Sequence, residues 1–496
     1  MMIKRFFLAL LALLLLLVAA LALNTLRQGS RQLNVPPIPV LAVDKKAAAE
    51  HLSEAVRART ITSPENPAQN ADQFLLLQAM LQTSYPKAHA LLKREVVGGL
   101  SLLYTWPGSD AAALPILLMA HQDVVPIAPG TDKDWAVEPF SGAIKDGFIW
   151  GRGAWDDKGN LISQMEAVEL LASASFKPKR TIYLAYGADE EIGGLRGARQ
   201  IAALLKERGV RLDFVIDEGL LVTDGVLPGL KQTAALVGMA EKGKVSLLLR
   251  VPSAPGHSSM PPPTGTSAIA KMSTALKRIE EDPFPAKISG VAGEMFATLA
   301  PEMSGFSRVA LSNLWLFGPI VQKQLEAGAS TNAMLRTTTA LTMTHAGNKE
   351  NVLPGVAEAT INFRLLPGDS IASVVERVKK QVTESLGSDK FELSVLPAWN
   401  EATQVASTAS APYGILNRTM REVFPDTLVA PALYIAASDS IHFVGLSDNV
   451  FRFSPVRAKS EDLSRFHGTN ERISVDNLAD LVRFYHRLLT LGAQAS

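Results

Sequence analysis

Three stretches of the chain join a nearly continuous apolar run to a polar cluster at its end. They are LPILLMAHQD (114–123), TIYLAYGADEE (181–191) and LDFVIDEG (212–219). An apolar run that does not alternate is typical of a strand buried on both faces of a parallel sheet. Between these runs, apolar residues recur at spacings of three and four within 161–172 and 195–205, which predicts two helices.

Strands that alternate with helices predict an α/β fold with a doubly wound, mostly parallel sheet that helices cover on both faces. Ligands of such sheets bind at the carboxyl ends of the strands, where these polar clusters fall. Near the end of the chain, residues 475–489 form an amphipathic helical pattern, and Ser474 is its expected N-cap.

The pattern changes after residue 243. The elements predicted there are strands within 244–253, 332–344, 355–368 and 391–399 and helices within 265–282 and 370–382. This order indicates a smaller α+β domain inserted into the first one. We therefore predict a main domain formed by residues 43–242 and 399–496 and an inserted lid or dimerisation domain at 243–398.

The first residues predict a membrane-targeting helix. Lys4 and Arg5 precede an uncharged run, 6–23, whose length lies between a signal-peptide core and a spanning helix. Residues 1–23 are therefore a signal anchor or a signal peptide, with a small-residue cleavage site at Ala20-Leu21-Ala22; the long Leu-rich run favours the uncleaved anchor. The body is expected outside the cytoplasm, anchored or, after cleavage, secreted. Residues 24–42 are Pro-rich and predict a linker.

Composition narrows the chemistry. The 496 residues are 47% hydrophobic and 20% charged with a formal net charge of +1, which is typical of a globular protein and gives no sign of nucleic-acid binding. The chain has no cysteine, so disulfides, catalytic thiols and thiolate metal ligands are excluded. Any metal ion must be held by His, Asp and Glu.

The polar clusters offer such residues. His121 and Asp123 are two positions apart in an extended segment, so they point the same way, as a ligand and the carboxylate that orients it. In GRGAWDDKG, Asp156 has two oxygens that can bridge two cations, whereas Asp157 and Lys158 have structural roles, neutralising each other or a helix end. An exposed His–Asp pair and an acidic helix start are the plainer alternatives.

The later clusters extend the set. Of Glu190 and Glu191, one can bind metal while the other acts as general base; a solvated acidic turn is the alternative, which the apolar strand before it disfavours. Either Asp217 or Glu218 supplies a terminal carboxylate. His467 supplies a second imidazole, with Glu471 available to fix it or the helix that follows.

Two imidazoles and at least three carboxylates suit a pair of borderline to hard divalent ions such as zinc. Such a pair activates water and polarises a carbonyl, and Glu190 would take and return the proton. The adjacent acids are thus explained as groups that face cations.

Eight segments in order resemble the M20 family of di-zinc metallopeptidases, and within it the branch of carboxypeptidase S and the N-acyl-amino-acid hydrolases/synthases, from about residue 45 to the end. They are HQDVVP, GRGAWDDKG, DEEIGG, DEG, GHSSMPP, NVLPG, FRLLPG and HGTNERI. The resemblance implies two zinc ions held by His121, Asp156, Glu191, Asp217 or Glu218, and His467, with Asp156 bridging. It also implies Asp123 as the support of His121, Glu190 as general base, and a cis peptide between Asp156 and Asp157.

The resemblance assigns three further residues. His257 matches a lid histidine that polarises the scissile carbonyl and that a partner subunit donates in dimeric relatives, so a homodimer through the inserted domain is a possible partner arrangement. Arg364 and Asn351 match positions that hold the free carboxylate of the substrate. In ASDSIHF (437–443), Ile441 stands where relatives have Arg, so recognition of the far end of the substrate is expected to differ.

We therefore expect a membrane-tethered or exported hydrolase of N-acyl amino acids or small peptides with a free carboxylate. The segment ALSNLWLFGPIVQKQL (310–325) favours a lipid-like acyl group or, alternatively, is a packed lid helix. The competing interpretations are a dipeptidase or carboxypeptidase that acts on small peptides, and an inactive relative that only binds ligands.

Overall fold

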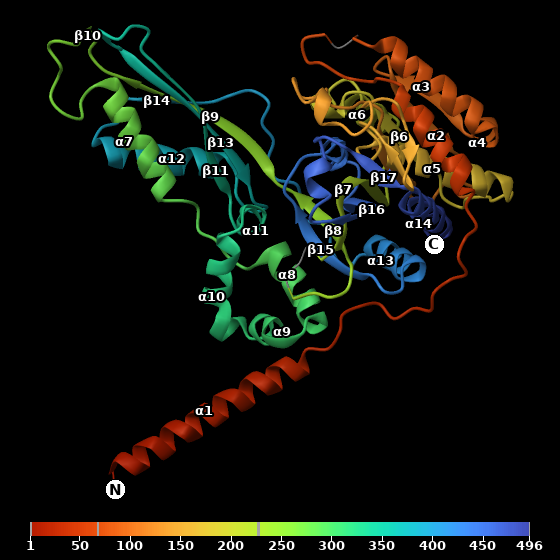
Figure 1. The fold of residues 1–496 in the computed structure, drawn as a ribbon, viewed down its shortest axis with the longest axis horizontal. Helices are drawn as coiled ribbons and strands as arrows, with labels where there is room; N and C mark the ends of the chain where they lie inside the picture. Colours follow the sequence, from red (N-terminus) through yellow and green to blue (C-terminus); the bar gives the residue numbers. More distant parts are fainter. Residues whose placement is uncertain (1, 67–68, 226–228, 496) are drawn as a thin grey trace. The chain divides into compact units, whose positions relative to one another are not determined.

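The computed structural model describes residues 2–66, 69–225 and 229–495 (Figure 1). The chain divides into two compact units. The first consists of Met1–Met239, Glu294–Asn313 and Ala406–Ser496, and the second of Ala240–Gly293 and Leu314–Val405. Each unit is described separately below, and the predicted boundaries at 43, 243 and 399 stay predictions.

The first unit is built on an eight-stranded sheet. Its order is β1 (Lys93–Val97), β2 (Ser101–Trp106), β6 (Ile182–Gly187), β3 (Ile116–His121), β7 (Phe214–Asp224), β16 (Val450–Lys459), β8 (Ala234–Glu241) and β15 (Leu428–Tyr434). The four central strands, β6, β3, β7 and β16, are parallel to one another, and strands β1, β2 and β8 pair antiparallel with their neighbours. The predicted strands at 114–123, 181–191 and 212–219 are the centre of this sheet.

Helices cover both faces of the sheet, which confirms the doubly wound α/β fold. Leu117 and Met119 of β3 belong to a core cluster with Ile201 and Leu205 of α6 (Ala198–Glu207). On the other face, Gly492 of α14 (Val475–Gln494) lies close to Ile116. The alternation of side chains along β3 therefore buries both faces.

Three helices pack together on the second of these faces. They are α2 (Lys45–Arg57), α5 (Lys158–Ser173) and α14, which lie side by side in Figure 1. Ser474 caps α14 as predicted, since its side chain accepts a hydrogen bond from the Asn477 amide. The unit also contains the helices α3 (Ala71–Ser84), α4 (Pro86–Leu91), α9 (Gly305–Ser312) and α13 (Ala411–Val423). Helix α8 (Gly290–Leu299) crosses from the second unit into the first.

A small three-stranded sheet joins distant parts of the first unit. It consists of β4 (Ile144–Lys145), β5 (Phe148–Trp150) and β17 (Arg472–Ser474). Arg472 pairs with Trp150, so the segment that precedes Asp156 and Asp157 is held beside the segment that follows His467.

The second unit is an antiparallel sheet with helices on one face. The strand order is β11 (Thr338–Ala346), β13 (Val356–Leu365), β9 (Gly243–Pro252) and β14 (Glu392–Val395). Helices α7 (Ala268–Glu281) and α12 (Ile371–Leu386) cover a core that includes Leu247, Ile361 and Val378. Short strands β10 (Gly256–His257) and β12 (Val352–Leu353) form a separate pair.

One predicted strand of this unit is partly wrong. Residues 332–335 end the helix α11 (Ala329–Leu335), and the strand begins only at Thr338. Ala, Met and Leu are strong helix formers. In addition, the buried Lys242 ammonium donates to the carbonyls of Ala333 and Arg336 and so satisfies acceptors at the end of this helix.

The predicted apolar helix at the start of the chain is present as α1 (Met2–Arg27). Among the described residues it is the only helix that is long and apolar enough to cross a membrane, and no residue of its most apolar window is buried. Helix α10 (Leu314–Glu326), in the Leu-rich segment, has no buried residue, which argues against a packed lid helix there.

Candidate active site

The candidate site lies where the central strands end. His121 is the last residue of β3, and Glu190 begins the short turn η2 (Glu190–Ile192) that follows β6. Asp217 and Glu218 follow the point on β7 where pairing with β3 ends. Asp156 lies in the loop before α5, and His467 lies in the loop after β16. The topology thus brings residues that are far apart in sequence to one edge of the sheet.

Two groups of possible ligands share Asp156. The first contains His121, Asp156 and Glu218, and the second contains Asp156, Glu191 and His467. Asp156 Oδ1 lies 3.0 Å from His121 Nε2, and its Oδ2 lies 2.8 Å from His467 Nε2. One carboxylate therefore faces both groups, with one oxygen for each, which is the arrangement of a bridging ligand.

The outer members of the two groups are Glu218 and Glu191. Glu218 Oε1 is 3.6 Å from His121 Nε2, and Glu191 Oε2 is 3.4 Å from His467 Nε2. The second oxygen of Glu191 is buried and has no hydrogen-bond partner. A buried carboxylate oxygen without a donor is costly, and a cation would satisfy it.

Both carboxylate oxygens of Asp217 accept hydrogen bonds from main-chain amides. Its Oδ2 accepts a hydrogen bond of 2.7 Å from the Ser440 amide, and its Oδ1 accepts one of 2.9 Å from the Glu218 amide. Neighbouring residues on a strand point to opposite sides. Of the two alternatives from sequence, the geometry favours Glu218 as the ligand and gives Asp217 the task of holding Ser440.

Asp123 supports two parts of the site at once. Its main-chain oxygen lies 2.9 Å from His121 Nδ1, which leaves Nε2 directed toward Asp156. Its carboxylate accepts hydrogen bonds of 3.1 Å from the amides of Glu190 and Glu191. Asp123 therefore fixes both His121 and the turn that carries the two glutamates.

Glu190 lies beside the two groups and belongs to neither. Its Oε2 is 4.0 Å from His121 Nε2. Burial raises the pKa of Glu190 well above its ordinary value, and the nearby Glu218 carboxylate raises it further. A carboxyl group that is readily protonated, next to a place for metal-activated water, suits a general base that must later act as an acid.

Crowding of carboxylates shapes the other pKa values. Burial, followed by repulsion from Asp156, raises the pKa of Glu218 well above its ordinary value. Hydrogen bonds to Asp156 and Glu191 raise the pKa of His467 to about 10. For Asp156 itself, burial acts upward, but hydrogen bonds with the two imidazoles outweigh it and hold the pKa below its ordinary value. The site therefore attracts positive charge, whether protons or metal ions.

A second buried cluster holds the Asp156 loop, and it centres on Glu471. Glu471 Oε1 accepts hydrogen bonds from the amides of Gly153, Trp155 and Asp156 at 2.9, 2.9 and 3.1 Å. Its Oε2 accepts one of 2.6 Å from Arg152 Nη1. Arg152 Nη2 also donates to the His467 and Gly468 carbonyls at 3.0 and 3.1 Å, so one pair fixes both loops. Sequence reasoning offered Glu471 as a support for His467 or a helix and missed Arg152, because nothing in the spacing joins residues 152 and 471.

The structural roles expected for Asp157 and Lys158 are found. Lys158 Nζ donates to the carbonyls of Ala55 and Ala58 at the end of α2, at 2.9 and 2.6 Å. Asp157 accepts hydrogen bonds from the His121 amide and the Asn160 side chain. The peptide between Asp156 and Asp157 is cis, as the family resemblance implies.

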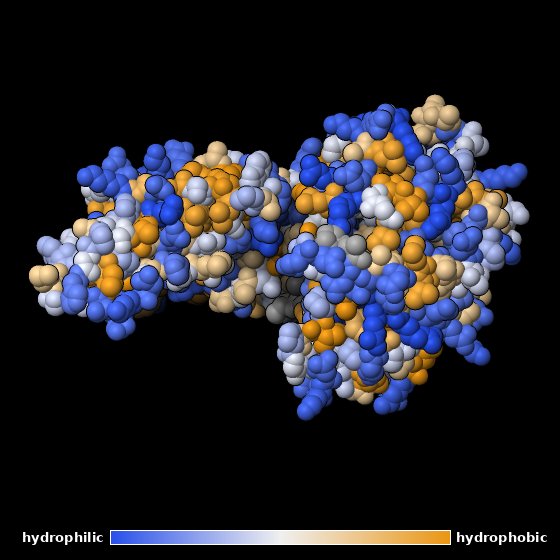
Figure 2. Space-filling model, turned by 90° about the horizontal axis from the view of Figure 1, so that it is seen from above, coloured by the Kyte–Doolittle hydropathy of each residue, from blue (hydrophilic) through white to orange (hydrophobic). Residues whose placement is uncertain are grey.

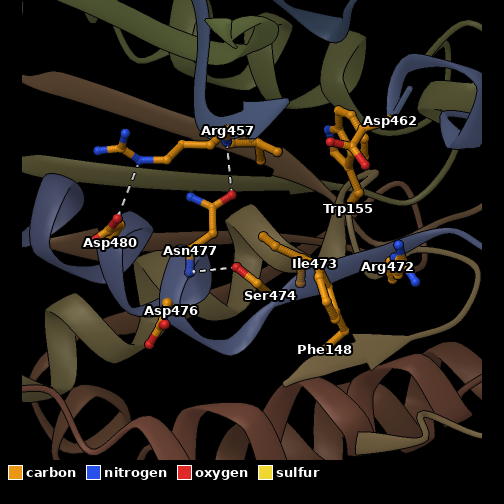
Figure 3. Close-up of a pocket in the computed structure, with 11 residues that line it drawn as sticks. Phe148, Trp155, Arg457, Asp462, Arg472, Ile473, Ser474, Asp476, Asn477 and Asp480 are labelled. Carbon is orange, nitrogen blue, oxygen red and sulfur yellow. Dashed lines mark hydrogen bonds and ion pairs between the residues drawn. The ribbon is translucent and has the colours of Figure 1, made fainter. Parts of the chain in front are cut away.

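A small cavity of about 150 Å³ lies near this loop, and Trp155 is among the residues that line it. Some of its polar groups interact with one another, as Figure 3 shows: Arg457 Nε lies 3.5 Å from Asp480, and the Arg457 amide donates to Asn477. Since none of the candidate ligands lines it, this cavity belongs to the packing around β17 and α14.

The residues expected to contact substrate lie in the second unit. His257 is exposed and pairs with Val352, and the amide next to it, of Ser258, donates to the Asn351 main-chain oxygen. The structure thus brings His257 and Asn351 close together. Arg364 lies on β13, in register with Lys244 of β9. Ile441 lies in the turn η4 (Asp439–Phe443) of the first unit.

The donor set fits divalent metal ions. It offers two imidazoles and carboxylates only, in two groups that share one residue, which is the chemistry expected for zinc or a similar ion. No thiolate competes, because the chain has no cysteine.

Comparison with known proteins supports this interpretation. The family model of peptidase family M20/M25/M40 matches residues 117–491. The N-fatty-acyl-amino acid synthase/hydrolase PM20D1 of Xenopus tropicalis is 41% identical over 90% of this chain and 86% of its own length. The probable carboxypeptidase S-like 2 of Dictyostelium discoideum is 39% identical over 95% of this chain and 91% of its own length.

A solved structure extends the comparison to the fold. The M20 family metallo-carboxypeptidase Sso-CP2 from Sulfolobus solfataricus superposes with a TM-score of 0.63, at 16% identity, over 92% of this chain and 100% of that one. The fold, the ordered segments and the matched family model agree. The chain therefore belongs to peptidase family M20/M25/M40 and is a metal-dependent hydrolase of amide or peptide bonds.

Proposed function

We propose that this hydrolase cleaves the amide bond of N-acyl amino acids that have a free carboxylate, with two zinc ions. The observation that carries the proposal is the pair of three-residue groups that share Asp156. We assign His121, Asp156 and Glu218 to one ion and Asp156, Glu191 and His467 to the other. Bound ions would supply an activated water and a polarised carbonyl.

The side chains of this chain perform the remaining steps. Glu190 accepts the proton of the attacking water and returns it to the amide nitrogen as the bond breaks. Asp123 holds His121 and the Glu190 turn in place. By resemblance to the family, Arg364 and Asn351 hold the substrate carboxylate, and His257, from this chain or from a partner in a homodimer, polarises the scissile carbonyl.

The acyl preference rests on similarity and on the N-terminal helix. The PM20D1 relative is named for fatty-acyl amino acids, and α1 would keep the enzyme at a membrane, with its body outside the cytoplasm, where long-chain amphiphiles partition. We propose that α1 is an uncleaved anchor. A free carboxylate on the amino-acid part is common to this substrate and to the peptides that a carboxypeptidase cleaves.

One experiment tests the proposal. The purified full chain is analysed for bound metal and assayed with amino acids acylated by chains of two to about eighteen carbons, beside dipeptides of the same amino acids. We expect two zinc ions per chain and kcat/KM that rises with acyl length, because each buried methylene contributes about 0.8 kcal/mol. Faster cleavage of dipeptides than of every acyl amino acid would reassign the enzyme as a dipeptidase or carboxypeptidase. Inactivity toward all of them with metal bound would favour the ligand-binding alternative.

A further inference from the structure

The segment between α1 and α2 is hydrogen-bonded along the first unit, although it contains no helix or strand after Arg27. The Gln32 side chain makes two hydrogen bonds with the main chain of Val429, donating at 3.1 Å and accepting at 2.7 Å. Further along, the Ile38 amide donates to the Glu422 carbonyl at 3.2 Å, and the Leu41 carbonyl accepts from Arg483 at 3.0 Å. Residues 28–41, here named the strap, are therefore a fixed connection and not a free linker.

The end of α1 is attached to α9 by a polar cluster. Asn24 Nδ2 donates to the Ser312 carbonyl at 2.6 Å, and Gln28 Nε2 donates to the same oxygen at 3.0 Å. Asn313 Nδ2 donates to the Thr25 hydroxyl at 3.0 Å. Thr25, Ser312 and Asn313 are all buried. We name this cluster the latch. It satisfies the last carbonyl of α9, which no residue of that helix can satisfy.

Because the latch attaches the end of α1 to α9, it fixes the position along α1 at which the rest of the first unit begins. The uncharged residues 6–23 extend beyond it, which at about 1.5 Å per residue is about 27 Å, close to the hydrocarbon thickness of a bilayer. When α1 crosses a membrane, the latch must therefore lie at the surface of that membrane. Arg27 and Arg31, both exposed, follow at the level of the lipid head groups, where basic residues interact with anionic lipids.

Large apolar side chains are exposed beside the latch. Phe306, in the first turn of α9, is 69% exposed, and Trp315 is 62% exposed. Trp315 follows the latch residue Asn313 by two positions, so their Cα atoms are at most about 7 Å apart in any arrangement of the two units. Aromatic side chains at the level of the head groups are typical of surfaces that contact a membrane. In contrast, Figure 2 shows a face on which hydrophobic residues are scattered among hydrophilic ones.

We propose that the chain docks on a lipid bilayer through Phe306 of the first unit and through Trp315, which follows the latch by two residues at the start of the second unit, and that the latch and the strap hold the first unit there. The occupant of this surface is the head-group region of the membrane that α1 crosses. The inference rests on the proposal that α1 remains an uncleaved anchor, and it is independent of the substrate. Docking would place the hydrolase at the bilayer surface and not at the end of a flexible linker.

Fluorescence quenching tests the docking. Because the chain has no cysteine, single variants such as Phe306→Cys and Gln200→Cys accept one dye each. Gln200 is an exposed residue of α6, which lies far from α9 within the first unit (Figure 1). The full chain is reconstituted in vesicles of equal parts phosphatidylethanolamine and phosphatidylglycerol that carry a head-group quencher. We expect strong quenching and a blue shift at position 306 and little change at position 200.

Variants of the latch separate docking from anchoring. The double variant Asn24→Ala/Gln28→Ala removes only side-chain donors at the end of α1 and the start of the strap, so α9 and the main sheet keep their own contacts, and Asn34→Ala, an exposed residue of the strap, is the matched control. We expect the latch variant to lose most of the quenching at position 306 while it still floats with the vesicles, and the control to retain it.

Three results would overturn the proposal. One is equal quenching at positions 306 and 200, and the second is no quenching at 306 in a chain that floats with the vesicles. The third is a latch variant that is quenched like the unaltered chain. Intact-mass analysis shows separately whether α1 is retained. A chain that has lost α1 yet hydrolyses its substrate would refute the anchor and the docking and leave the proposed function in place.

Discussion

The loop from Arg152 to Asp156 lies between two clusters of buried charge that differ in composition. On one side, the carboxylates of Asp156, Glu190, Glu191 and Glu218 share only two imidazoles, and one buried oxygen of Glu191 has no partner. On the other side, every oxygen of Glu471 accepts hydrogen bonds from the loop or from Arg152. Buried charge that is paired stabilises a conformation, whereas buried charge in excess indicates a ligand that is to be bound. This difference distinguishes the candidate metal site from the scaffold, the Arg152–Glu471 pair that holds the Asp156 loop in place.

The largest loss of activity is expected when Glu190, which carries the proton, is replaced. Glu190→Gln should lower kcat by about two to four orders of magnitude with nearly normal metal content, because an amide cannot accept the proton. Asp156→Ala should lower activity as well, but through loss of both ions. Steady-state kinetics with metal analysis of both variants measures the contrast. A Glu190→Gln enzyme with normal turnover would remove Glu190 from the mechanism.

A second large effect, on metal content, is expected when Glu218 is replaced and not when its neighbour Asp217 is replaced. Glu218→Gln should remove one zinc ion per chain and most of the activity, whereas Asp217→Asn should retain both ions. Asp217 accepts hydrogen bonds from the Glu218 and Ser440 amides and from the Ser438 side chain, so its replacement should cost about 1 kcal/mol of stability. Metal content by mass spectrometry and unfolding by urea give the two readouts. Metal loss in Asp217→Asn with full occupancy in Glu218→Gln would reverse the assignment.

A smaller effect, on zinc affinity, is expected when Glu471, which holds the Asp156 loop, is replaced. Glu471→Gln replaces one charged acceptor of the Asp156 loop, and we expect zinc affinity to fall by about 10- to 100-fold, as for other residues that orient metal ligands. The exposed Glu461→Gln is the matched control. Competition with a zinc chelator measures the affinity. Added zinc should restore the turnover of Glu471→Gln, since the chemical groups are intact; a deficit that persists at saturating zinc would give Glu471 a role in the reaction itself.

The smallest expected effect is a dependence of the stability of the metal-free protein on pH. The pKa values of Glu190 and Glu218 are raised by folding from an ordinary 4.5, and that of His467 is raised from 6.5 to about 10. Such groups stabilise the fold while protonated, and this contribution is lost as pH rises through the folded pKa. Asp156, whose pKa is lowered, is already ionised above about pH 5 and adds no slope there.

The metal-free protein should therefore lose stability as pH rises from about 5 to about 9, and zinc should raise Tm more at the higher pH. Thermal unfolding of the chelator-treated and zinc-loaded protein measures this. If the Tm of the metal-free protein instead rose with pH across this interval, the carboxylates of the candidate metal site would not be an excess of buried negative charge that destabilises the fold.

Much of this arrangement was predictable from local patterns. The unbroken apolar runs identify β3, β6 and β7, and the polar residues at their ends identify His121, Glu190 and the Asp217–Glu218 pair, because ligands of parallel sheets bind at that edge. The antiparallel edges of the sheet were not predicted. Residues 332–335 were assigned to a strand, since a short apolar run does not reveal that Lys242 caps a helix there.

Other features depend on contacts that no pattern contains. The choice between Asp217 and Glu218 requires the phase of the strand, which only the Ser440 amide reveals. The Arg152–Glu471 pair joins segments more than three hundred residues apart. The latch between α1 and α9 is likewise a contact between distant segments, and composition alone described residues 24–42 as a linker.

The order of the segments has a consequence for biosynthesis. His467 and Glu471 follow β16, the last of the parallel strands along the chain, so the candidate metal site combines residues from distant parts of the sequence. A nascent polypeptide that has not yet released these residues from the ribosome holds neither the second group of ligands nor the carboxylate that shapes the Asp156 loop. We therefore expect that hydrolysis does not start during translation and that a chain ending before His467 is inactive.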